Sequence, residues 1–252
     1  MPDDAKSVTA AIVIIGNEIL SGRTQDMNVQ FLATRLNELG VQLREVRVVA
    51  DIEDAVVKAV NECRAEYDYL FTTGGIGPTH DDITSHCLAK AFGVRNVLND
   101  EAKAILVDHY AGGELNEARL RMAHTPEGAT LIENPISKAP GYQIGNVFVL
   151  AGVPVIMQAM FESLRHRLVG GAPVRSLTIS VALPEGRLAR PLGVIQGEFT
   201  DVEIGSYPFF RAGVVGCSLV LRSDSEARLA VAGDRVRRMI RDAGGEPVED
   251  HE

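Results

Sequence analysis

The chain has 252 residues, 46% of them hydrophobic, which suffices for one large core or for one core and a small second domain. Its formal net charge of -9 argues against nucleic acid as the main partner, because binding to a phosphate backbone needs clustered Lys and Arg. No apolar run approaches the roughly 20 residues of a membrane span, and the acidic N-terminal stretch lacks the features of a secretory signal, so we expect a cytoplasmic protein with no membrane partner.

The first part of the chain alternates between predicted strands and predicted helices. The apolar run Thr9–Ile15 is typical of a central strand that is covered on both faces, whereas the less regular alternation in Val41–Val49 suits a strand nearer the sheet edge. This order of elements predicts βαβ crossovers and a largely parallel sheet. The predicted elements are strands at 9–15, 41–49 and 67–73, and helices at 29–39, 52–63 and 82–92.

The next segment contains further predicted helices and short strands. A helical pattern over 100–123 is expected to break at Gly112-Gly113, and Gly145-Asn146 is typical of a turn between two strands. Pro154 opens another predicted helix, since proline is favoured in the first helical turn. The predicted elements are strands at 130–133, 142–144 and 147–150, and a helix at 154–168.

The segment Gly170–Pro173 is predicted to be a domain boundary, because glycine and proline interrupt regular structure. The order of elements changes after it to strand, helix, strand, strand, helix. We therefore predict an α/β domain at residues 1–170 and a small α+β domain at 174–252. The predicted elements of the small domain are strands at 177–183, 202–207 and 214–222, and helices at 186–199 and 226–243.

The three cysteines, Cys63, Cys87 and Cys217, are far apart in the sequence and form no Cys-x-x-Cys pair. Each is flanked by apolar or helix-forming residues, so we predict that all three are small members of a hydrophobic core. This usage indicates a reducing compartment.

The strongest local signal is the segment Thr72–Thr84, here called the glycine turn, in which Gly74, Gly75 and Gly77 follow a predicted strand. Glycines at this place let the backbone approach a ligand closely and adopt positive φ. The helix that follows offers free N–H groups and the positive end of its dipole, which together favour an anion. The pattern matches neither the Walker A motif nor the dinucleotide fingerprint. The alternative is a tight strand-to-helix turn with an N-capping Asp.

The glycine turn resembles the signature of the molybdopterin-binding domain of molybdenum-cofactor biosynthesis proteins. Three further blocks match that family in the same order, namely Gly16–Gly22, Asn134–Gly141 and Ala151–Pro154. The resemblance implies a three-layer α/β/α sandwich with a mostly parallel sheet for residues 1–170, to which the small C-terminal α+β domain is added.

Within this family the chain resembles the CinA-like proteins (competence/damage-inducible protein A) and the N-terminal domain of eukaryotic FAD synthase. The block Asp201–Pro208 extends the likeness to FAD synthase into the small domain. Leu150-Ala151-Gly152 departs from the Leu-Pro-Gly that the family usually has. Because the sequence stops at Glu252, we expect neither the amide-hydrolysing domain of CinA proteins nor the adenylyl-transferring domain of FAD synthases.

The resemblance implies a ligand site around the glycine turn with two acidic residues as its catalytic groups. Asp82 matches the acidic residue that molybdopterin adenylyltransferases use in catalysis, and Asp51 matches a second acidic position of the family. A carboxylate repels phosphate unless a divalent cation bridges the two, so Asp82 and Asp51 are also candidate ligands of Mg²⁺ or another divalent cation. The candidate ligand-binding residues are Gly16, Glu18, Thr73, Gly74, Gly75, Gly77, Pro78, Thr84, Ser137, Lys138 and Gly152.

Several of these residues also have a simple structural explanation. Asp82 and Asp51 each stand at the start of a predicted helix, where a capping carboxylate serves the backbone alone. The alternative for Glu18 is hydrogen bonding within its own loop, and the alternative for Lys138 is solvation at the surface. His80 is a candidate general acid or base, because the unperturbed pKa of histidine lies near neutrality. The family varies at this position, so we predict a spectator.

Two functions compete, and both use backbone amides to hold phosphate and a metal ion with carboxylates to neutralise charge. The first is binding of a phosphorylated pterin such as molybdopterin, or of a nucleotide, with activation by nucleotidyl transfer. The second is metal-dependent hydrolysis of a nucleotide diphosphate such as ADP-ribose or FAD. A non-catalytic scaffold or sensor is the third reading. Homo-oligomers are also expected, because relatives of this domain commonly self-associate.

Overall fold

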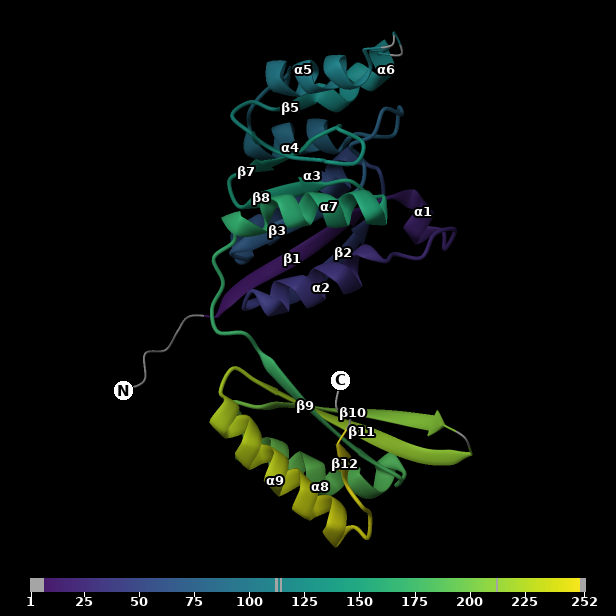
Figure 1. Ribbon diagram of the computed structural model, residues 1–252, viewed down its shortest axis with the longest axis vertical. Helices are drawn as coiled ribbons and strands as arrows, with labels where there is room; N and C mark the ends of the chain where they lie inside the picture. Colours follow the sequence, from purple (N-terminus) through teal and green to yellow (C-terminus); the bar gives the residue numbers. More distant parts are fainter. Residues whose placement is uncertain (1–6, 112, 114, 212, 250–252) are drawn as a thin grey trace, which may run out of the picture. The chain divides into compact units, whose positions relative to one another are not determined.

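The computed structural model describes residues 7–111, 113, 115–211 and 213–249. The chain divides into two compact units, Met1–Gly171 and Ala172–Glu252, each with its own strands and helices (Figure 1). The chain leaves the larger unit at a close backbone contact, because the Gly171 N–H donates to the carbonyl oxygen of Gly40 at 3.0 Å.

The elements of the larger unit, with η for 3₁₀ helices, are β1 (Val8–Ile15), α1 (Asn17–Leu20), α2 (Asn28–Glu38), β2 (Val41–Val49), α3 (Glu53–Glu66), β3 (Tyr69–Thr73), α4 (Thr84–Phe92), β4 (Asn96–Leu98), α5 (Asp100–His109), α6 (Glu117–Leu120), η1 (Arg121–Ala123), β5 (His124–Pro126), β6 (Thr130–Ile132), β7 (Gly141–Ile144), β8 (Val147–Leu150), α7 (Pro154–Leu164) and η2 (Arg165–Arg167). The main sheet has the strand order β2-β1-β3-β8-β7-β6. β2, β1, β3 and β8 are parallel, whereas β7 and β6 are antiparallel, so the predicted mostly parallel sheet is confirmed.

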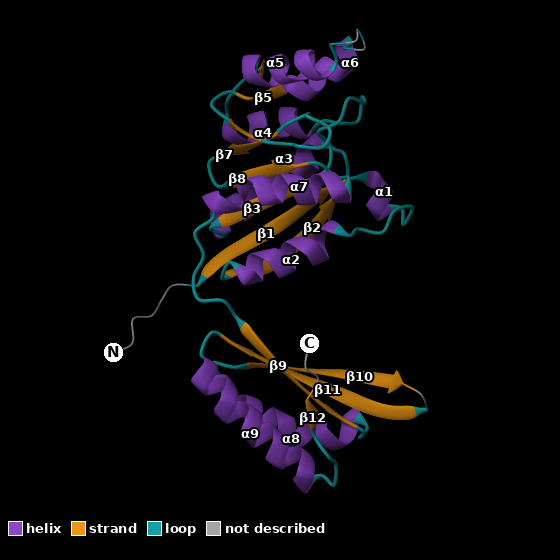
Figure 2. Ribbon diagram, in the orientation of Figure 1, coloured by secondary structure: helices purple, strands orange, loops and turns teal. Residues whose placement is uncertain are grey.

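Helices cover both faces of this sheet, which makes the larger unit a three-layer α/β/α sandwich (Figure 2). Successive residues of β1 point to opposite faces, as the strand geometry requires. Ile12 lies on one face in a core with Leu32 of α2 and with residues of α7. Its neighbour Val13 packs in the second core with Val60 of α3 and with residues of α4. Burial on both sides explains why β1 reads as a continuous apolar run.

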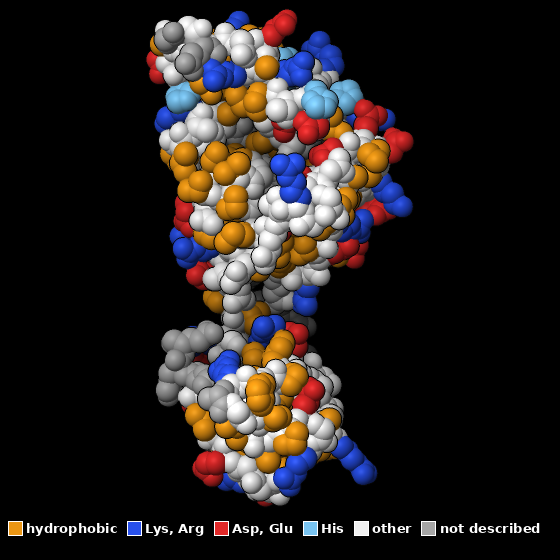
Figure 3. All heavy atoms as spheres, turned by 90° about the vertical axis from the view of Figure 1, so that its right-hand side faces the viewer, with side chains coloured by type: hydrophobic (Ala, Val, Ile, Leu, Met, Phe, Trp, Pro, Cys, Tyr) orange, Lys and Arg blue, Asp and Glu red, His pale blue; other side chains and the backbone are white. Residues whose placement is uncertain are grey.

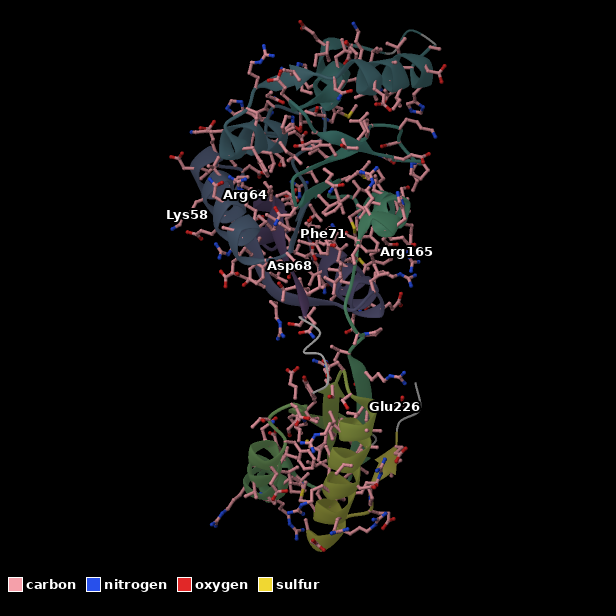
Figure 4. All side chains as sticks on the ribbon, turned by 90° about the vertical axis from the view of Figure 1, so that its left-hand side faces the viewer. Lys58, Arg64, Asp68, Phe71, Arg165 and Glu226 are labelled. Carbon is pink, nitrogen blue, oxygen red and sulfur yellow. The ribbon has the colours of Figure 1, made fainter. Side chains whose placement is uncertain are left out.

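Three aromatic rings form the centre of the first of these cores. Phe71 of β3 stacks on Phe148 of β8 with ring centroids 5.2 Å apart, and its centroid lies 6.0 Å from that of Phe161 in α7. All three side chains are buried, and Figure 4 labels Phe71 within the larger unit. Aromatic pairs at these separations stabilise a core beyond the area that they bury.

Two helices begin later than the sequence predicts. α3 begins at Glu53 and not at residue 52, and α4 begins at Thr84 and not at Asp82. The residues that precede them, Ile52 and Ile83, occupy the N-cap positions and make no side-chain cap hydrogen bond. The prediction that Asp51 or Asp82 caps a helix is therefore wrong.

Residues 96–126 contain a short strand pair that the sequence does not predict. β4 and β5 pair antiparallel, with Asn96 opposite Pro126 and Leu98 opposite His124. β4 and β5 have three residues each, and neither Asn96–Leu98 nor His124–Pro126 alternates polar with apolar residues, so the pattern missed them. The helical pattern over 100–123 is confirmed as α5 and α6; of its predicted break, Gly113 has φ +90° and Gly112 lies outside the described residues.

The elements of the smaller unit are β9 (Arg175–Val181), α8 (Glu185–Glu198), β10 (Glu203–Arg211), β11 (Val214–Ser223), α9 (Glu226–Asp242) and β12 (Val248–Glu249). Its sheet has the order β10-β11-β9-β12 and is antiparallel throughout. A separate core contains Leu188 of α8 and Val236 of α9 together with Ile179 and Leu219 of the strands. The predicted α+β domain is confirmed, and β12 is an addition to it.

The three cysteines are buried and free, so their prediction as core residues is confirmed. Cys63 and Cys87 belong to the core beneath α3 and α4, and Cys217 belongs to the core of the smaller unit. Burial raises the pKa of the Cys63 and Cys87 thiols to about 11. Among the described residues, no helix combines the length and the apolar character that a membrane crossing requires.

Replacement of Phe71 by Ala is expected to lower the free energy of unfolding of the larger unit by about 3–5 kcal/mol, because it leaves a cavity between Phe148 and Phe161. The measurement is urea unfolding followed by tyrosine fluorescence, since four of the five tyrosines lie in the larger unit. Val107→Ala is the control, because Val107 is 48% exposed and its loss should cost less than about 0.5 kcal/mol. Equal effects of the two variants would contradict this account of the core.

Candidate functional site

Parallel strands of the larger unit end at one edge of the sheet, and the segments that follow them form the candidate site. Gly16 follows β1, Asp51 lies just beyond β2, Gly74 follows β3, and Gly152 lies just beyond β8. In Figure 1 β1 runs toward the side that carries α1, and Figure 3 views the molecule from that side. On this face of the larger unit His side chains lie beside Asp and Glu side chains. Ligands of open α/β sheets bind at such an edge.

Gly74 and Gly75 give the glycine turn a backbone that other residues rarely adopt. Their φ angles are +98° and +68°. A Cβ atom on Gly74 would lie 2.2 Å from the carbonyl oxygen of Ile15, so a side chain cannot be accommodated there. The Gly74 N–H donates to the carbonyl oxygen of Leu150 at 3.2 Å. The turn is therefore held between the ends of β1 and β8.

Thr84, the first residue of α4, braces the turn from inside. Its hydroxyl donates to the carbonyl oxygen of Gly74 at 2.9 Å, and its N–H donates to the carbonyl oxygen of Gly75 at 3.0 Å. The side chain is fully buried. The helix start after Ile83 has no side-chain cap, which leaves the positive end of the α4 dipole toward the turn.

Asp82 lies in the loop before α4, where Thr79 holds its carboxylate. Oδ2 accepts hydrogen bonds from the Thr79 N–H at 2.8 Å and from the Thr79 hydroxyl at 2.5 Å. A Cβ on Gly77 would lie 2.7 Å from the same oxygen, so a side chain there would displace this carboxylate. Asp82 is thus fixed in the last part of the glycine turn, and the alternative that it caps α4 does not hold.

Asp51 is held by the loop that follows β1. Its Oδ2 accepts a hydrogen bond from the Asn17 N–H at 2.8 Å. The carboxyl oxygens of Glu18 in the same loop lie close to Gly16, where a Cβ would come within 2.5 Å of Oε1. The β1 loop therefore gathers Asp51 and Glu18 at the edge of the sheet, and ligand or metal contact by either residue stays a prediction.

Asn28, at the start of α2, is a polar residue that the sequence analysis does not single out. Its Nδ2 donates to the carbonyl oxygen of Gly152 at 2.9 Å, and the residue is only 3% exposed. Its Oδ1 is buried and has no hydrogen-bond partner among the described residues. In the sequence, Asn28 is only a polar residue directly ahead of the apolar stripe of α2. Such a residue is equally typical of an ordinary helix start, so the sequence did not identify Asn28 as part of the site.

Ser137 and Lys138 lie in the loop after β6, within the block Asn134–Gly141. Asn134 organises this loop, because its Oδ1 accepts from the Ile136 and Ser137 N–H groups, both at 3.1 Å. The Ser137 hydroxyl accepts from Asn134 Nδ2 at 2.7 Å. Lys138 is exposed and has a positive φ of +61°. Neither residue lines the pocket described next, and their ligand contacts stay predictions.

A pocket of about 220 Å³ lies against the glycine turn. Part of its wall comes from the turn and from the start of α4, and part comes from η1 and the β4–β5 pair. The sequence analysis missed this second part, because its residues follow the turn at a distance and carry no motif. The lining residues are Gly75, Ile76, Gly77, Asp82, Ser85, His86, Asn96, Arg121 and His124.

Thr73, Pro78 and His80 are not among the lining residues of this pocket. Thr73 is 1% exposed, and its hydroxyl lies beneath the turn without a hydrogen-bond partner among the described residues. Pro78 is half-buried in the loop that leads to Asp82. The His80 side chain is 94% exposed, with Nδ1 3.9 Å from Asp81 Oδ1. His80 thus occupies a position that suits the predicted spectator.

Metal binding by protein side chains alone has little support at this edge. The described part of the chain contains no group of three or more His, Cys, Asp or Glu side chains that could hold a metal ion. Two carboxylates, Asp82 and Asp51, remain as donors, each fixed by a different backbone N–H. Mg²⁺ is often bound by one or two carboxylates with phosphate oxygens and water, so carboxylates are the kind of donor that such an ion needs. Asp82 lines the pocket and Asp51 does not, and metal contact by either residue stays a prediction.

The sandwich, the strand order and the glycine turn at the carboxyl edge define an α/β protein of the molybdopterin-binding type. The chain belongs to the family described as "Probable molybdopterin binding domain", whose model matches residues 11–169. A second model, described as "FAD synthase, middle domain", matches residues 173–248.

Relatives whose sequences match most of this chain occur in Pyrobaculum aerophilum and in Caenorhabditis elegans. A protein of Pyrobaculum aerophilum is 35% identical over 253 residues, which cover 92% of this chain and 94% of the relative. A "Probable FAD synthase" of Caenorhabditis elegans is 32% identical over 258 residues, which cover 92% of this chain but 50% of that protein. Among solved structures, the crystal structure of the protein CinA of unknown function from Thermoplasma acidophilum matches this chain with a sequence identity of 34% and a TM-score of 0.61. The match covers 64% of this chain and 98% of that one.

Replacement of Gly75 by Ala is expected to destabilise the larger unit, because the new Cβ would lie 2.2 Å from the Thr84 hydroxyl oxygen. Gly22→Ala is the matched control: Gly22 has φ +71° with no atom within 4 Å, so it reports the roughly 1–2 kcal/mol of a left-handed Ala alone. Adding Thr84→Ala removes the clash, so Gly75→Ala should cost about 0.5–3 kcal/mol less in that background. If the effects of Gly75→Ala and Thr84→Ala on the free energy of unfolding were strictly additive, the close contact between Thr84 and Gly75 would be contradicted.

Proposed function

We propose that the larger unit binds a phosphorylated small molecule, a pterin such as molybdopterin or a nucleotide, at the glycine turn. The observation that carries this proposal is the backbone of Gly74 and Gly75, which leaves no room for side chains and lies next to an uncapped helix start. Backbone N–H groups and a helix dipole at such a place favour phosphate oxygens. Family membership supports a pterin as the ligand. The net negative charge of the chain does not oppose the proposal, because the proposed phosphate contacts come from the local backbone.

Two acidic residues supply the second half of this proposal. Asp82 and Asp51 would hold a divalent cation such as Mg²⁺ together with phosphate oxygens of the ligand. When bound, the cation would neutralise negative charge that the carboxylates would otherwise repel. The role of the chain is to keep both carboxylates at the edge of the sheet, which the hydrogen bonds from Thr79 and Asn17 achieve.

Hydrolysis of a nucleotide diphosphate such as ADP-ribose or FAD is the second candidate. It is favoured by the smaller unit, which matches the middle domain of FAD synthase, and by the match of most of this chain to half of the C. elegans relative. In this reaction Asp82 would position the metal or the attacking water, while the turn amides would hold the phosphoryl group that is attacked.

A panel of ligands separates the candidates. ADP-ribose, FAD, NAD and ATP are incubated with the protein and Mg²⁺, Mn²⁺ or Co²⁺, and products are resolved by chromatography. Release of a nucleoside monophosphate from one compound would select hydrolysis. If no compound is hydrolysed and calorimetry shows tight binding of a pterin, the binding function is selected. If neither hydrolysis nor pterin binding is detected, a scaffold or sensor that does not bind this ligand remains.

Asp82→Asn is expected to lower any diphosphate hydrolysis by on the order of a hundredfold or more, since a neutral amide positions a metal ion poorly. The Asn side-chain oxygen can still accept the hydrogen bond from the Thr79 N–H, so the turn should persist. Asp81→Asn is the control, because the Asp81 side chain is 60% exposed and lies outside the pocket lining. Near-normal turnover of the Asp82 variant would remove the proposed role of this carboxylate.

A further inference from the structure

The pocket at the glycine turn has a second wall that the proposed function does not use. The pairing of β4 with β5 and the preceding η1 place Asn96, Arg121 and His124 on the pocket that Gly75 and Asp82 also line. Its volume of about 220 Å³ is below the roughly 300–1,000 Å³ of sites that enclose a whole ligand. The pocket therefore suits one group of a larger ligand.

Arg121 carries the one permanent positive charge among the described residues that line this pocket. Its guanidinium forms neither an ion pair nor a hydrogen bond with any described residue. By contrast, Arg95 just before β4 donates two hydrogen bonds to Glu127, at 3.1 and 2.6 Å. In a chain with 34 Asp and Glu against 25 Lys and Arg, an unpaired arginine on a pocket wall is available for an anionic ligand.

His124 adds a second nitrogen group to the same wall. Its Nδ1 lies 3.3 Å from the carbonyl oxygen of Leu120, which can only accept. Nδ1 therefore carries the hydrogen, and Nε2 on the other side of the ring is left for a ligand. A protonated His124 would donate from Nε2 to an anion.

Ser85 contributes a hydroxyl whose direction is set from the core. The Tyr142 hydroxyl lies 3.1 Å from Ser85 Oγ and donates to it. Tyr142 is buried, and burial raises its pKa, so it remains a donor at neutral pH. Because Ser85 accepts this bond, its own hydrogen is free to be donated. Arg121 of η1 and Ser85 of α4 thus offer donors to a pocket whose acidic member is Asp82, and His124 of β5 adds a donor when its ring is protonated.

We propose that Arg121, assisted by His124 and Ser85, binds a second phosphoryl group of the ligand. The site would then select compounds with two linked phosphoryl groups, such as nucleoside diphosphates and their esters, over single phosphate esters. This inference rests on the proposed function, because the first phosphoryl group occupies the glycine turn. Arginine suits the second position, since its planar fork of N–H groups matches the oxygens of a phosphate.

The test is calorimetric titration, in the presence of Mg²⁺, with AMP and with the non-hydrolysable α,β-methylene analogue of ADP. Arg121→Gln should weaken binding of the analogue about 10- to 100-fold, the effect of one hydrogen bond to a charged group. Binding of AMP should change less than about twofold. Arg121→Lys keeps the charge but lacks the planar guanidinium, so its affinity for the analogue should lie between those of the wild-type protein and Arg121→Gln. Arg44→Gln, an exposed arginine at the start of β2, is the control for net charge.

Equal binding of the analogue by wild-type protein and Arg121→Gln would overturn the inference. An equally large loss of affinity for AMP would also overturn it, because it would place Arg121 at the first phosphate. Circular dichroism of the variant separates this loss from unfolding. Failure of the wild-type protein to bind either compound would also overturn it. Tight binding of a phosphorylated pterin would in that case leave the proposed function standing.

Discussion

Hydrogen bonding between parallel strands determines where the candidate site lies. Because β2, β1, β3 and β8 run in the same direction, the loops that follow them emerge at one edge of the sheet. The contacts across that edge are made mainly by the backbone: the N–H of Gly74 reaches the end of β8, and the N–H of Asn17 reaches Asp51. Packing of β1 on both faces keeps this edge in place, so the geometry of the glycine turn depends on the core beneath it.

The fold was predictable because its signals are local and repeated. Long apolar runs, helical stripes and glycines at element ends marked the parallel strands and their crossovers, and β2 lies at the sheet edge as its patchy alternation indicated. The glycine turn was also predictable, since Gly74 and Gly75 are required by positive φ and by contacts that exclude a Cβ. Helix starts were less certain. An acidic residue ahead of a helix suggests a cap, yet Asp82 bonds to Thr79 and Asp51 bonds to Asn17.

The second wall of the pocket was beyond the reach of sequence patterns. Arg121 and His124 have no motif and no periodicity, and only the pairing of two three-residue strands brings them to the turn. Asn28 illustrates a different limit. Its position ahead of α2 predicts a helix start, and nothing in the sequence indicates that its amide reaches Gly152 across the end of the sheet. Long-range partners of single polar residues depend on tertiary packing, which local patterns do not encode.

The two units bury separate sets of residues, because the core of β9–β12, α8 and α9 shares no member with the clusters of the larger unit. The core of each unit is therefore formed by residues of that unit alone. The C. elegans relative matches this chain across both cores, and the match covers 50% of that longer protein, so two self-contained cores of this kind can be joined to further polypeptide.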